Sequence, residues 1–325
     1  MNIAIVGCGL IGNKRAKALP AGHALVACAD TNLDRAKSLA QTRAGCLATP
    51  DWRVAVDRAD VVIVCTINNM LAEVARTAAE AGKHVLVEKP AGRNVAELLA
   101  TREAAQRSGA IVKVGFNHRL HPALIKAREI WDTGVCGQLM YVRGRYGQGG
   151  RLGMEVEWRG KRALAGGGEM LDQGVHLIDL ARWFAGDFVD VAGHVSRYFW
   201  DWEVEDNGFA LLKTATGATA FLHASCTEWK NTFSFEIFGR EGKLQVDGLG
   251  GSYGVEKLTH YQMLPHMGPP ATTSWEWPFP DDSWELELKY FLKCIDRHET
   301  PAGNIDDAIA ALRVVETLYE RSQIK

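Results

Sequence analysis

Three glycines near the amino terminus constrain the fold of this chain more than any other feature. Gly7, Gly9 and Gly12 have the spacing Gly-x-Gly-x-x-Gly, and they directly follow a short apolar run at Asn2–Val6. Glycines so placed allow a tight turn between strand and helix, let the backbone approach a pyrophosphate, and let the helix pack closely on the strand. The pattern therefore predicts a parallel α/β sheet whose first turn binds a dinucleotide.

An acidic residue stands where the second strand of such a sheet would end. Asp30 follows the apolar run Leu25–Ala29 and lies 18 residues after Gly12. A carboxylate there accepts hydrogen bonds from the adenosine ribose and repels the 2′-phosphate of NADP. Because Thr31 and Asn32 follow it, with no arginine to pair with a phosphate, we expect NAD, and NADP is the less favoured cofactor. A glycine-rich turn with an unrelated surface aspartate is the alternative.

The first 120 residues alternate between strand and helix patterns, which favours a doubly wound parallel (Rossmann) sheet. Apolar runs predict strands at Asn2–Val6, Leu25–Ala29, Asp60–Cys65, Val85–Val87 and Ile111–Gly115. We predict a dinucleotide-binding domain over residues 1–120.

Residues 121–325 have a different pattern, with longer runs that alternate between apolar and polar residues. These runs predict strands at Leu139–Tyr146, Val189–Trp202, Gly208–Lys213, Ala218–Cys226, Phe233–Gly239 and Lys243–Val246. Helical patterns occupy Pro122–Thr133, Glu169–Phe184, Trp284–Arg297 and Ile305–Ser322. We therefore predict an α+β domain with a large, mainly antiparallel open sheet. The tryptophan-rich run Trp275–Trp284 is predicted as a loop over this sheet or an oligomer contact.

The charge balance and the cysteines limit the classes of partner. Lys and Arg total 37 and Asp and Glu total 39, which gives a net charge of −2. This balance points neither to nucleic acid nor to a membrane surface as a partner. No apolar run approaches the roughly 20 residues that a membrane helix needs. The seven cysteines are scattered and form no Cys-x-x-Cys pair, so we expect reduced thiols and a cytoplasmic location.

A lysine stands at the end of another predicted strand. Val85–Val87 is followed by Glu88, Lys89 and Pro90. In an open parallel sheet, ligands bind beyond the carboxyl ends of the strands, so a lysine at that position is directed at a ligand. Pro90 stiffens the turn, and its peptide bond is a candidate for the cis form. We expect Lys89 to reach a substrate that lies on the nicotinamide ring.

A second informative segment is Gly166–Asp179, which begins with three glycines and continues with a helical pattern. The glycines allow close backbone approach or a hinge. Asp172 and His176 are four residues apart and would share one face of the helix. A histidine beside a carboxylate is held in position and made more basic, as a general base requires. The same spacing also occurs in purely structural pairs, and that alternative stays open. We predict no metal site, because no further Cys or His stands at ligand spacing.

In combination, these motifs resemble the Gfo/Idh/MocA oxidoreductases (glucose–fructose oxidoreductase, inositol dehydrogenase and relatives). The similar segments are the fingerprint Gly7–Gly12, the acid Asp30, EKP at Glu88–Pro90, GFNHR at Gly115–Arg119 and GGGEMLDQGVHLID at Gly166–Asp179. The resemblance covers essentially the whole chain. It implies hydride transfer between NAD(H) and a hydroxyl or keto carbon of a sugar, nucleotide sugar or cyclitol, and a homodimer or homotetramer formed through the C-terminal sheet.

The resemblance also implies roles for single residues. Lys89 would contact the reacting oxygen, while Asp172 and His176 would bind substrate and transfer a proton. The expected cofactor-binding residues are Gly7, Gly9, Leu10, Ile11, Gly12, Asp30, Thr66, Asn68, Glu88, Lys89, Asn117, Trp158 and Arg159. The expected substrate-binding residues are Lys89, Arg145, Tyr146, Arg151, Asp172 and His176.

Departures and alternatives accompany this assignment. The loop that begins at Thr66 lacks the proline and histidine common in the family, and Arg15 stands where histidine is frequent. The run of arginines and aromatics between Arg145 and Lys161 suits a sugar ring or an anionic group, but a solvated loop would have a similar composition. An NAD-dependent glycoside hydrolase of the same superfamily and a non-catalytic nucleotide-binding regulator are the two competing functions.

Overall fold

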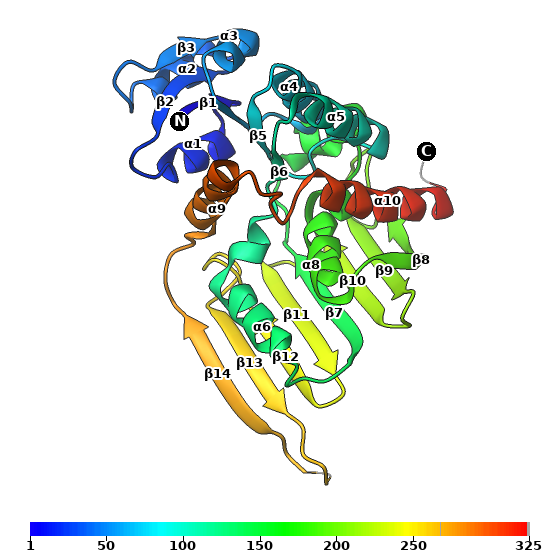
Figure 1. Cartoon of the computed structure of the whole chain (residues 1–325). Helices are drawn as coiled ribbons and strands as arrows, with labels where there is room; N and C mark the ends of the chain where they lie inside the picture. The colour runs from blue at the N-terminus through cyan, green and yellow to red at the C-terminus, as the bar shows by residue number, and fades with distance from the viewer. Residues whose placement is uncertain (267, 324–325) are drawn as a thin grey trace. The chain divides into compact units, whose positions relative to one another are not determined.

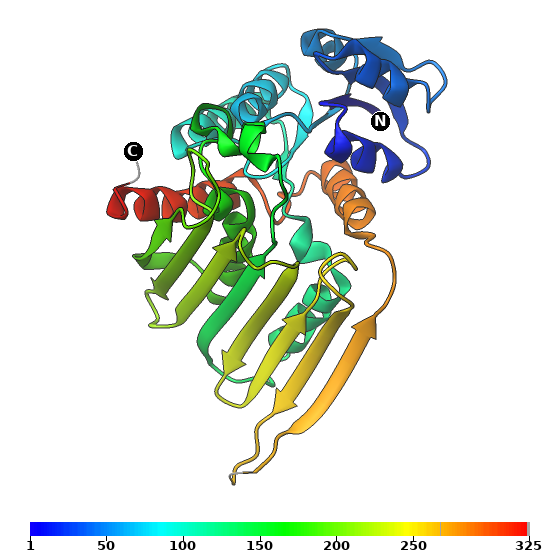
Figure 2. The same ribbon diagram turned by 180° about the vertical axis from the view of Figure 1, so that it is seen from behind.

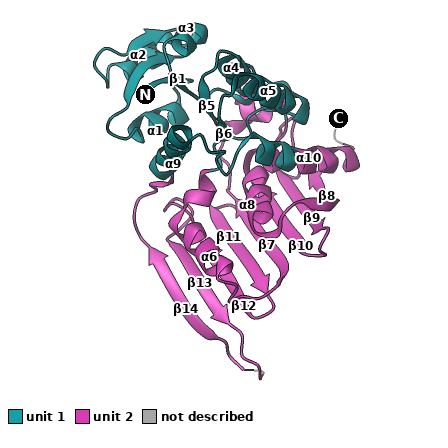
Figure 3. Cartoon of the chain, in the orientation of Figure 1, with its two compact units in different colours: residues 1–116, 163–166, 284–312 teal, residues 117–162, 167–283, 313–325 magenta. Residues whose placement is uncertain are grey.

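The computed structural model describes residues 1–266 and 268–323 (Figure 1). The chain forms two compact units, coloured separately in Figure 3. Unit 1 comprises Met1–Phe116, Ala163–Gly166 and Trp284–Leu312, and unit 2 comprises Asn117–Arg162, Gly167–Ser283 and Arg313–Lys325. Each unit consists of three separate segments of the chain, whereas the predicted domains, 1–120 and 121–325, are each continuous. The boundary near residue 120 therefore stays a prediction.

Unit 1 contains, within the described residues, a six-stranded parallel sheet with the order β3-β2-β1-β4-β5-β6. Its strands are β1 (Asn2–Val6), β2 (Ala24–Ala29), β3 (Leu47–Thr49), β4 (Val61–Val64), β5 (His84–Val87) and β6 (Val112–Val114). This is the strand order of a doubly wound dinucleotide-binding sheet, so the predicted fold class is confirmed here. The sequence patterns missed β3, because three residues at a sheet edge leave no recognisable run.

Helices and caps follow from local sequence in unit 1. The helices are α1 (Leu10–Lys17), α2 (Leu33–Ala40), α3 (Trp52–Asp57), α4 (Asn68–Glu80), α5 (Val95–Ser108), and most of α9 (Ser283–Arg297). The side chain of Asn32 caps α2, and that of Asn94 caps α5. Apolar residues of α1, α2 and α9 pack with Ile5 and Ile63 of the sheet in one core cluster. A helix from the far end of the chain thus completes the core of the first sheet.

Unit 2 contains an eight-stranded sheet with the order β14-β13-β12-β11-β7-β10-β9-β8 among the described residues. The strands are β7 (Leu139–Gly147), β8 (Phe188–Ser196), β9 (Asn207–Thr214), β10 (Thr219–Ser225), β11 (Thr232–Gly239), β12 (Gly242–Asp247), β13 (Glu256–Gln262) and β14 (Ala271–Trp277). Only the pairing of β7 with β10 is parallel in this part of the structure. The predicted open, mainly antiparallel sheet is therefore confirmed.

One face of this sheet carries helices, and Figure 2 shows the other. Helix α6 (Pro122–Asp132) packs on β12, β13 and β14, and helix α8 (Val175–Ala185) packs on β7 and β10. The remaining elements are η1 (Asn117–Leu120), η2 (Met154–Val156), η3 (Trp158–Gly160), α7 (Arg162–Ala165), the π-helical turn η4 (Met170–Gly174) and α10 (Ile305–Arg321). Helix α10 begins in unit 1 and ends in unit 2.

Three expectations for the second half are corrected. The helix predicted at Glu169–Phe184 begins as the π-helical turn η4, and regular α-helix starts only at Val175. The strand predicted at Val189–Trp202 ends at Ser196. The tryptophan-rich run is not a covering loop, because Trp275 and Trp277 belong to the edge strand β14, which pairs with β13. An isolated run of aromatics gives no sign of its pairing partner, which explains the error.

No helix within the described residues is both long and apolar enough to cross a membrane. All seven cysteines lie within this part of the chain, and each is a free thiol.

Candidate functional site

The glycine turn of unit 1 has the shape that a dinucleotide requires. A Cβ atom at Gly7, where φ is +93°, would collide with the carbonyl oxygen of Cys65, and one at Gly12 would collide with the carbonyl oxygen of Gly7. At Gly9, which precedes the first residue of α1, nothing lies within 4 Å of that position. The first turn of α1 contains no acidic residue, and no side chain caps it. The first backbone N–H groups of α1 therefore have no side-chain acceptor, which suits anion binding at a helix N-terminus.

Asp30 is fixed at the same turn by backbone hydrogen bonds. Its Oδ2 accepts a bond of 2.8 Å from the backbone N–H of Cys8, between the first two fingerprint glycines, and its Oδ1 accepts one of 2.8 Å from Asn32. Each carboxylate oxygen retains a further lone pair. The carboxylate is thus oriented beside the turn and can still accept hydrogen bonds from ribose hydroxyls.

The loop after β4 adds an unsatisfied hydroxyl to this turn. The Oγ1 atom of Thr66 is buried and has no hydrogen-bond partner in the described part of the chain. The backbone nitrogen of Thr66 also lies where a Cβ of Gly7 would have to go. Asn68, by contrast, uses its side-chain amide to donate a bond of 2.9 Å to the carbonyl oxygen of Ala165. Because buried polar groups are normally paired, the Thr66 hydroxyl fits a ligand group, and the residues of this turn suit a dinucleotide.

Glu88 lies in a buried network of four charges. Its Oε1 accepts a bond of 2.7 Å from Nε of Arg15, whose Nη2 contacts Glu287 Oε2 at 2.7 Å, and Glu287 Oε1 contacts Lys113 Nζ at 2.9 Å. The side chains of Arg15, Lys113 and Glu287 have no exposed surface. Burial raises the pKa of Glu88, and the Arg15 charge opposes that rise. Two cations therefore balance two anions directly before Lys89, whose peptide bond to Pro90 is cis.

Sequence reasoning missed this charge network. In the sequence, Arg15 stands out only as a departure from the family pattern, and nothing marks Glu287 as its partner. The presence of a lysine in the apolar run Ile111–Gly115 was the one available signal, because a charged residue inside a buried strand needs a partner.

In unit 2, the proposed proton-transfer residue lies in a cluster of aromatic and imidazole rings. His176 is the second residue of α8, and its imidazole stacks on that of His118 with ring centroids 3.7 Å apart and an interplanar angle of 22°. The ring of Tyr146 lies 6.2 Å from His176, and Tyr253 lies 5.0 Å from Tyr146. His118 and His176 are each 4% exposed and Tyr146 is 6% exposed. The structure thus brings together the predicted residues Tyr146 and His176, and adds His118 and Tyr253, which sequence reasoning missed.

The two phenols of this cluster are held in the neutral form. Burial raises the pKa of Tyr146 well above its usual range, and the charges of Asp172 and Glu169 add to the effect. Burial also raises the pKa of Tyr253 to about 12. Both hydroxyls therefore stay protonated at physiological pH and can act as hydrogen-bond donors.

Asp172 lies on the π-helical turn that precedes α8. Its Oδ2 is 3.6 Å from Nε of Arg159, whose guanidinium lies 4.6 Å from the ring centroid of Trp158. The Arg159 side chain is 42% exposed, so this ion pair is worth little energetically. The predicted cofactor residue Arg159 is accordingly placed next to the predicted substrate residue Asp172, and Trp158 packs against Arg159.

The glycines before Asp172 permit a close contact with Glu205. The carboxylate of Glu205 accepts hydrogen bonds from the N–H groups of Gly168 (2.9 Å) and Met170 (3.1 Å) and from the hydroxyl of Tyr319 (2.7 Å). A Cβ atom at Gly168 would collide with the backbone of Glu205, and one at Gly167 with the Tyr319 hydroxyl. Of the two roles considered for the glycines, close approach is the one realised. Glu205, which is 1% exposed, was not anticipated.

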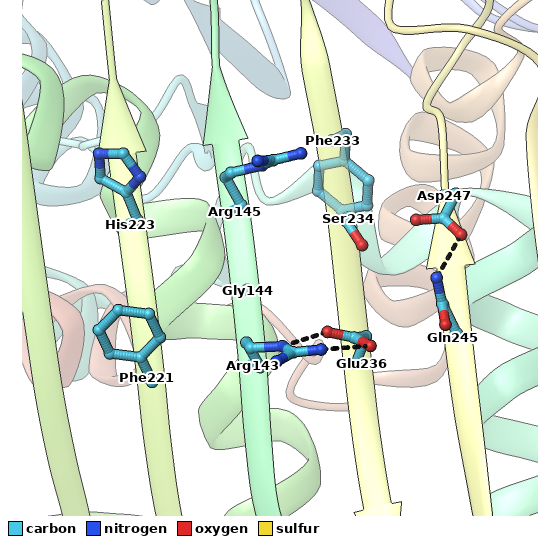
Figure 4. A pocket seen from close by; sticks show the side chains of 10 residues that line it. All are labelled: Arg143, Gly144, Arg145, Phe221, His223, Phe233, Ser234, Glu236, Gln245 and Asp247. Atoms are coloured by element: carbon cyan, nitrogen blue, oxygen red, sulfur yellow. Dashed lines mark hydrogen bonds and ion pairs between the residues drawn. The ribbon is translucent and has the colours of Figure 1, made fainter. Parts of the chain in front are cut away.

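Other predicted residues lie elsewhere. Arg145 is on the sheet face opposite to Tyr146, beside His223 of the neighbouring strand (Figure 4). Arg151 forms an ion pair with Glu157 and has a side chain that is 65% exposed. The amide of Asn117 donates a bond of 2.9 Å to Ser283 Oγ.

Lys89 belongs to unit 1 and His176 to unit 2, so their expected convergence on one substrate stays a prediction. Within the described residues, no group of three or more His, Cys, Asp or Glu side chains is arranged to hold a metal ion.

Comparison with known proteins gives consistent matches along the chain. Residues 1–116 match the profile described as "Oxidoreductase family, NAD-binding Rossmann fold", and residues 124–245 match "GFO/IDH/MocA C-terminal domain". The levoglucosan dehydrogenase of Pseudarthrobacter phenanthrenivorans is 28% identical over 286 residues, which cover 75% of this chain and 73% of that protein. The scyllo-inositol 2-dehydrogenase (NAD(+)) of Bacillus subtilis is 26% identical over 332 residues, which cover 96% of this chain and 91% of that protein.

Solved structures agree with these matches. A levoglucosan dehydrogenase in complex with NADH superposes with a TM-score of 0.89 at 25% identity, covering 99% of this chain and 98% of that one. Relatives named as NADP(+)-dependent also match.

Proposed function

The chain belongs to the GFO/IDH/MocA family of NAD-binding oxidoreductases, and we propose that it transfers a hydride between NAD(H) and a hydroxyl or keto carbon of a sugar, nucleotide sugar or cyclitol. As a member, it is an NAD(P)-dependent dehydrogenase or reductase. The observation that carries the finer proposal is the buried pair of His176 and Tyr146, with the half-buried Tyr253 against Tyr146 and the acidic residue Asp172 nearby. In such a cluster, His176 can act as a base towards a substrate hydroxyl, and the tyrosine hydroxyls can donate hydrogen bonds to the substrate. Burial of His176 and Tyr146 largely excludes water from this place.

Each proposed catalytic residue has one task. His176 exchanges a proton with the reacting oxygen, as histidine does in general acid–base catalysis. Lys89 donates a hydrogen bond from its ammonium to the same oxygen and polarises it. Asp172 binds the substrate through its carboxylate, which can accept hydrogen bonds from substrate hydroxyls. The bound dinucleotide supplies the hydride acceptor or donor.

The proposed function is tested by incubating the protein with NAD and a panel of sugars and cyclitols, including levoglucosan and scyllo-inositol, and recording NADH absorbance. Net NADH formation is expected. Lys89→Ala and His176→Ala should each lower turnover, the latter by roughly 10²- to 10⁴-fold, while NAD binding measured by calorimetry survives. Lys83→Ala, which removes a half-buried lysine directly before β5, is the matched control.

The outcomes separate the competing functions. Near-normal turnover in Lys89→Ala or His176→Ala would remove that residue from the mechanism. An NAD-dependent glycoside hydrolase recycles its cofactor within each turnover, so it would cleave a glycoside without net NADH. A non-catalytic regulator would bind nucleotide and convert no substrate.

NAD is the proposed cofactor, and the position of Asp30 at the glycine turn supports this preference. Asp30→Ala should weaken NAD binding and relax the discrimination against NADP, because the carboxylate no longer pairs with the ribose or repels a phosphate. The two dissociation constants, compared between wild type and variant, test the assignment. A wild-type protein that already binds NADP more tightly would contradict it.

We further propose that the open face of the eight-stranded sheet forms a homodimer or homotetramer. This face has a hollow of about 490 Å³ (Figure 4), and Phe221 and Leu211 on it are 47% and 50% exposed. Arg145 and Asp247 give it opposite charges within the same hollow, which suits pairing with a second copy across a two-fold axis.

The oligomeric state tests this surface. Arg145→Glu should shift the mass measured by light scattering towards the monomer, whereas Leu152→Ser, an exposed apolar residue outside the sheet, should not. A wild-type protein that is monomeric at micromolar concentration would contradict the proposal.

A further inference from the structure

The plane of the His176 ring is not set by its helix alone. His176 is the second residue of α8, and the χ2 torsion that orients a histidine ring has a broad, roughly two-fold preference. A ring nitrogen can exchange a proton with a substrate oxygen only if that oxygen lies close to the ring plane, because hydrogen bonds weaken steeply when they bend. Some neighbour must therefore fix the plane of this imidazole if it is to act as a base.

His118 is placed to fix this plane. Its ring lies flat against the His176 ring, with centroids 3.7 Å apart and planes inclined by 22°. Both rings are almost completely buried. Tyr146 and Phe233 pack edge-on against His118, with centroids at 5.1 Å and 5.9 Å and interplanar angles of 63° and 76°. Rotation of His176 about χ2 would thus drive it into a ring that has little room to yield.

The backbone directly after His118 is anchored to α8 by an ion pair. Arg119 forms a bidentate pair with Asp179, with Nε–Oδ2 and Nη2–Oδ1 distances of 2.8 Å and 2.5 Å. Asp179 lies one helical turn beyond His176 on the same helix. Two consecutive residues of η1 therefore contact α8 at two points one turn apart. This arrangement locks the register between the His118 ring and the His176 ring.

A third anchor lies just beyond His118 in the chain. Nδ1 of His121 is 2.9 Å from Oε2 of Glu256, and the other oxygen of Glu256 accepts a bond of 2.7 Å from the backbone N–H of Ala123. The rings of His118 and His121 are also in edge contact, with centroids 5.7 Å apart. The segment is thus fixed independently of the stack, so the His118 ring can serve as a support for His176.

We propose that His118 is a positioning residue, whose ring holds the His176 imidazole in the plane in which it exchanges a proton with the substrate. This inference rests on the proposed function, because it assigns His118 an effect on turnover through His176. His118 itself touches neither the substrate oxygen nor the cofactor in this proposal. The property that matters is a flat, rigid ring at this position.

Three substitutions separate stacking from simple filling of space. His118→Ala removes the ring and should lower kcat by roughly 10- to 100-fold, since small misplacements of a catalytic group have effects of that size. KM and the dissociation constant for NAD should stay within a few-fold of wild type. His118→Phe keeps a flat ring and should restore most of kcat, whereas His118→Leu fills the space without a flat face and should not. His260→Ala, which removes a partly buried imidazole from β13, is the matched control.

An NMR measurement reads the stack without any turnover. With histidine-labelled protein, the ring C–H resonance of His176, assigned from its loss in His176→Ala, should show an upfield ring-current shift in the wild type and in His118→Phe. The shift should disappear in His118→Ala and His118→Leu. Thermal melts of each variant check that it is folded.

The inference would be overturned if His118→Ala turned over at the wild-type rate, or if His118→Leu restored kcat as well as His118→Phe. Loss of the ring-current shift without any loss of kcat would overturn it as well. Failure of the proposed function looks different: His176→Ala would then be as active as wild type, or no substrate would be oxidised at all. If no substrate is oxidised, the NMR measurement still tests the inference, because a wild-type His176 resonance without the upfield shift would show that His118 does not stack on His176.

Discussion

The buried carboxylate of Glu205 should be the most sensitive support of the Asp172 segment. Oε1 accepts hydrogen bonds from Met170 N–H and the Tyr319 hydroxyl, and Oε2 accepts one from Gly168 N–H. Glu205→Ala leaves these three buried donors unpaired. Each unsatisfied donor costs about 1–3 kcal/mol, and removal of a buried charge returns part of that, so we expect a net loss of about 3–5 kcal/mol in the free energy of unfolding.

Two milder substitutions at the same contacts complete the series. Glu205→Gln can retain an oxygen at the Oε1 position but brings an N–H group against Gly168 N–H, which should cost about 1–3 kcal/mol. Tyr319→Phe removes one donor and leaves Oε1 paired with Met170, which should cost about 1–2 kcal/mol. Urea unfolding followed by far-ultraviolet dichroism and tryptophan fluorescence measures these losses, with unchanged m-values as the check on comparability.

The series also has a pH signature. Burial raises the pKa of Glu205, so the folded protein binds this proton more tightly than the unfolded chain does. The stability from this linkage is fully present below the unfolded-state pKa and is lost as pH rises through the folded-state pKa. Glu205→Gln should abolish this part of the pH dependence of the free energy of unfolding. A loss below 1 kcal/mol for Glu205→Ala, or one no larger than that for Tyr319→Phe, would refute the reasoning.

Further predictions concern the other buried ion pairs. Glu287→Gln leaves two cations, Arg15 and Lys113, with one remaining carboxylate, Glu88, and should lower the free energy of unfolding by about 3–5 kcal/mol. In the double variant Glu287→Gln/Lys113→Met the charges balance again, so urea unfolding should show that most of this loss is recovered. Burial acts to raise the pKa of Glu287, but the charges of Lys113 and Arg15 lower it below its usual value. The stability that ionised Glu287 contributes should therefore be lost as pH falls through its folded-state pKa. In acid, the free energy of unfolding of the wild type should fall with pH more steeply than that of Glu287→Gln. Arg119→Met strips a buried carboxylate of α8 of its bidentate partner and should also cost about 3–5 kcal/mol; a loss of under 1 kcal/mol in urea unfolding would show that water or another group replaces the guanidinium.

The features read correctly from the sequence are those that depend on neighbouring residues. The fingerprint glycines predicted the first turn because only residues without a Cβ fit where Gly7 and Gly12 lie. The apolar runs and polar alternation predicted both sheets, because the side-chain period of a strand is fixed at two. The same alternation could have separated Arg145 from Tyr146, since consecutive residues of one strand face opposite sides of a sheet.

The errors and omissions share a different origin, which is contact between residues far apart in the chain. Glu287 pairs with Arg15 across 272 positions, and nothing near either residue signals the other. The same holds for Glu205 and Tyr319, which are 114 residues apart. The π-helical turn η4 was also missed, because its hydrogen bonding depends on packing that a residue pattern does not encode.

The amino-acid sequence by itself determined the parallel sheet, the glycine turn with Asp30, and the segment that carries Asp172 and His176, because turns, caps and side-chain alternation are local properties of a chain. Only the tertiary structure decided that His118 lies against His176, that Glu205 supports the Gly168 turn, and that a helix near residue 290 completes the first core. Those pairings depend on which distant surfaces exclude water together, and burial of that kind is a property of the folded chain as a whole.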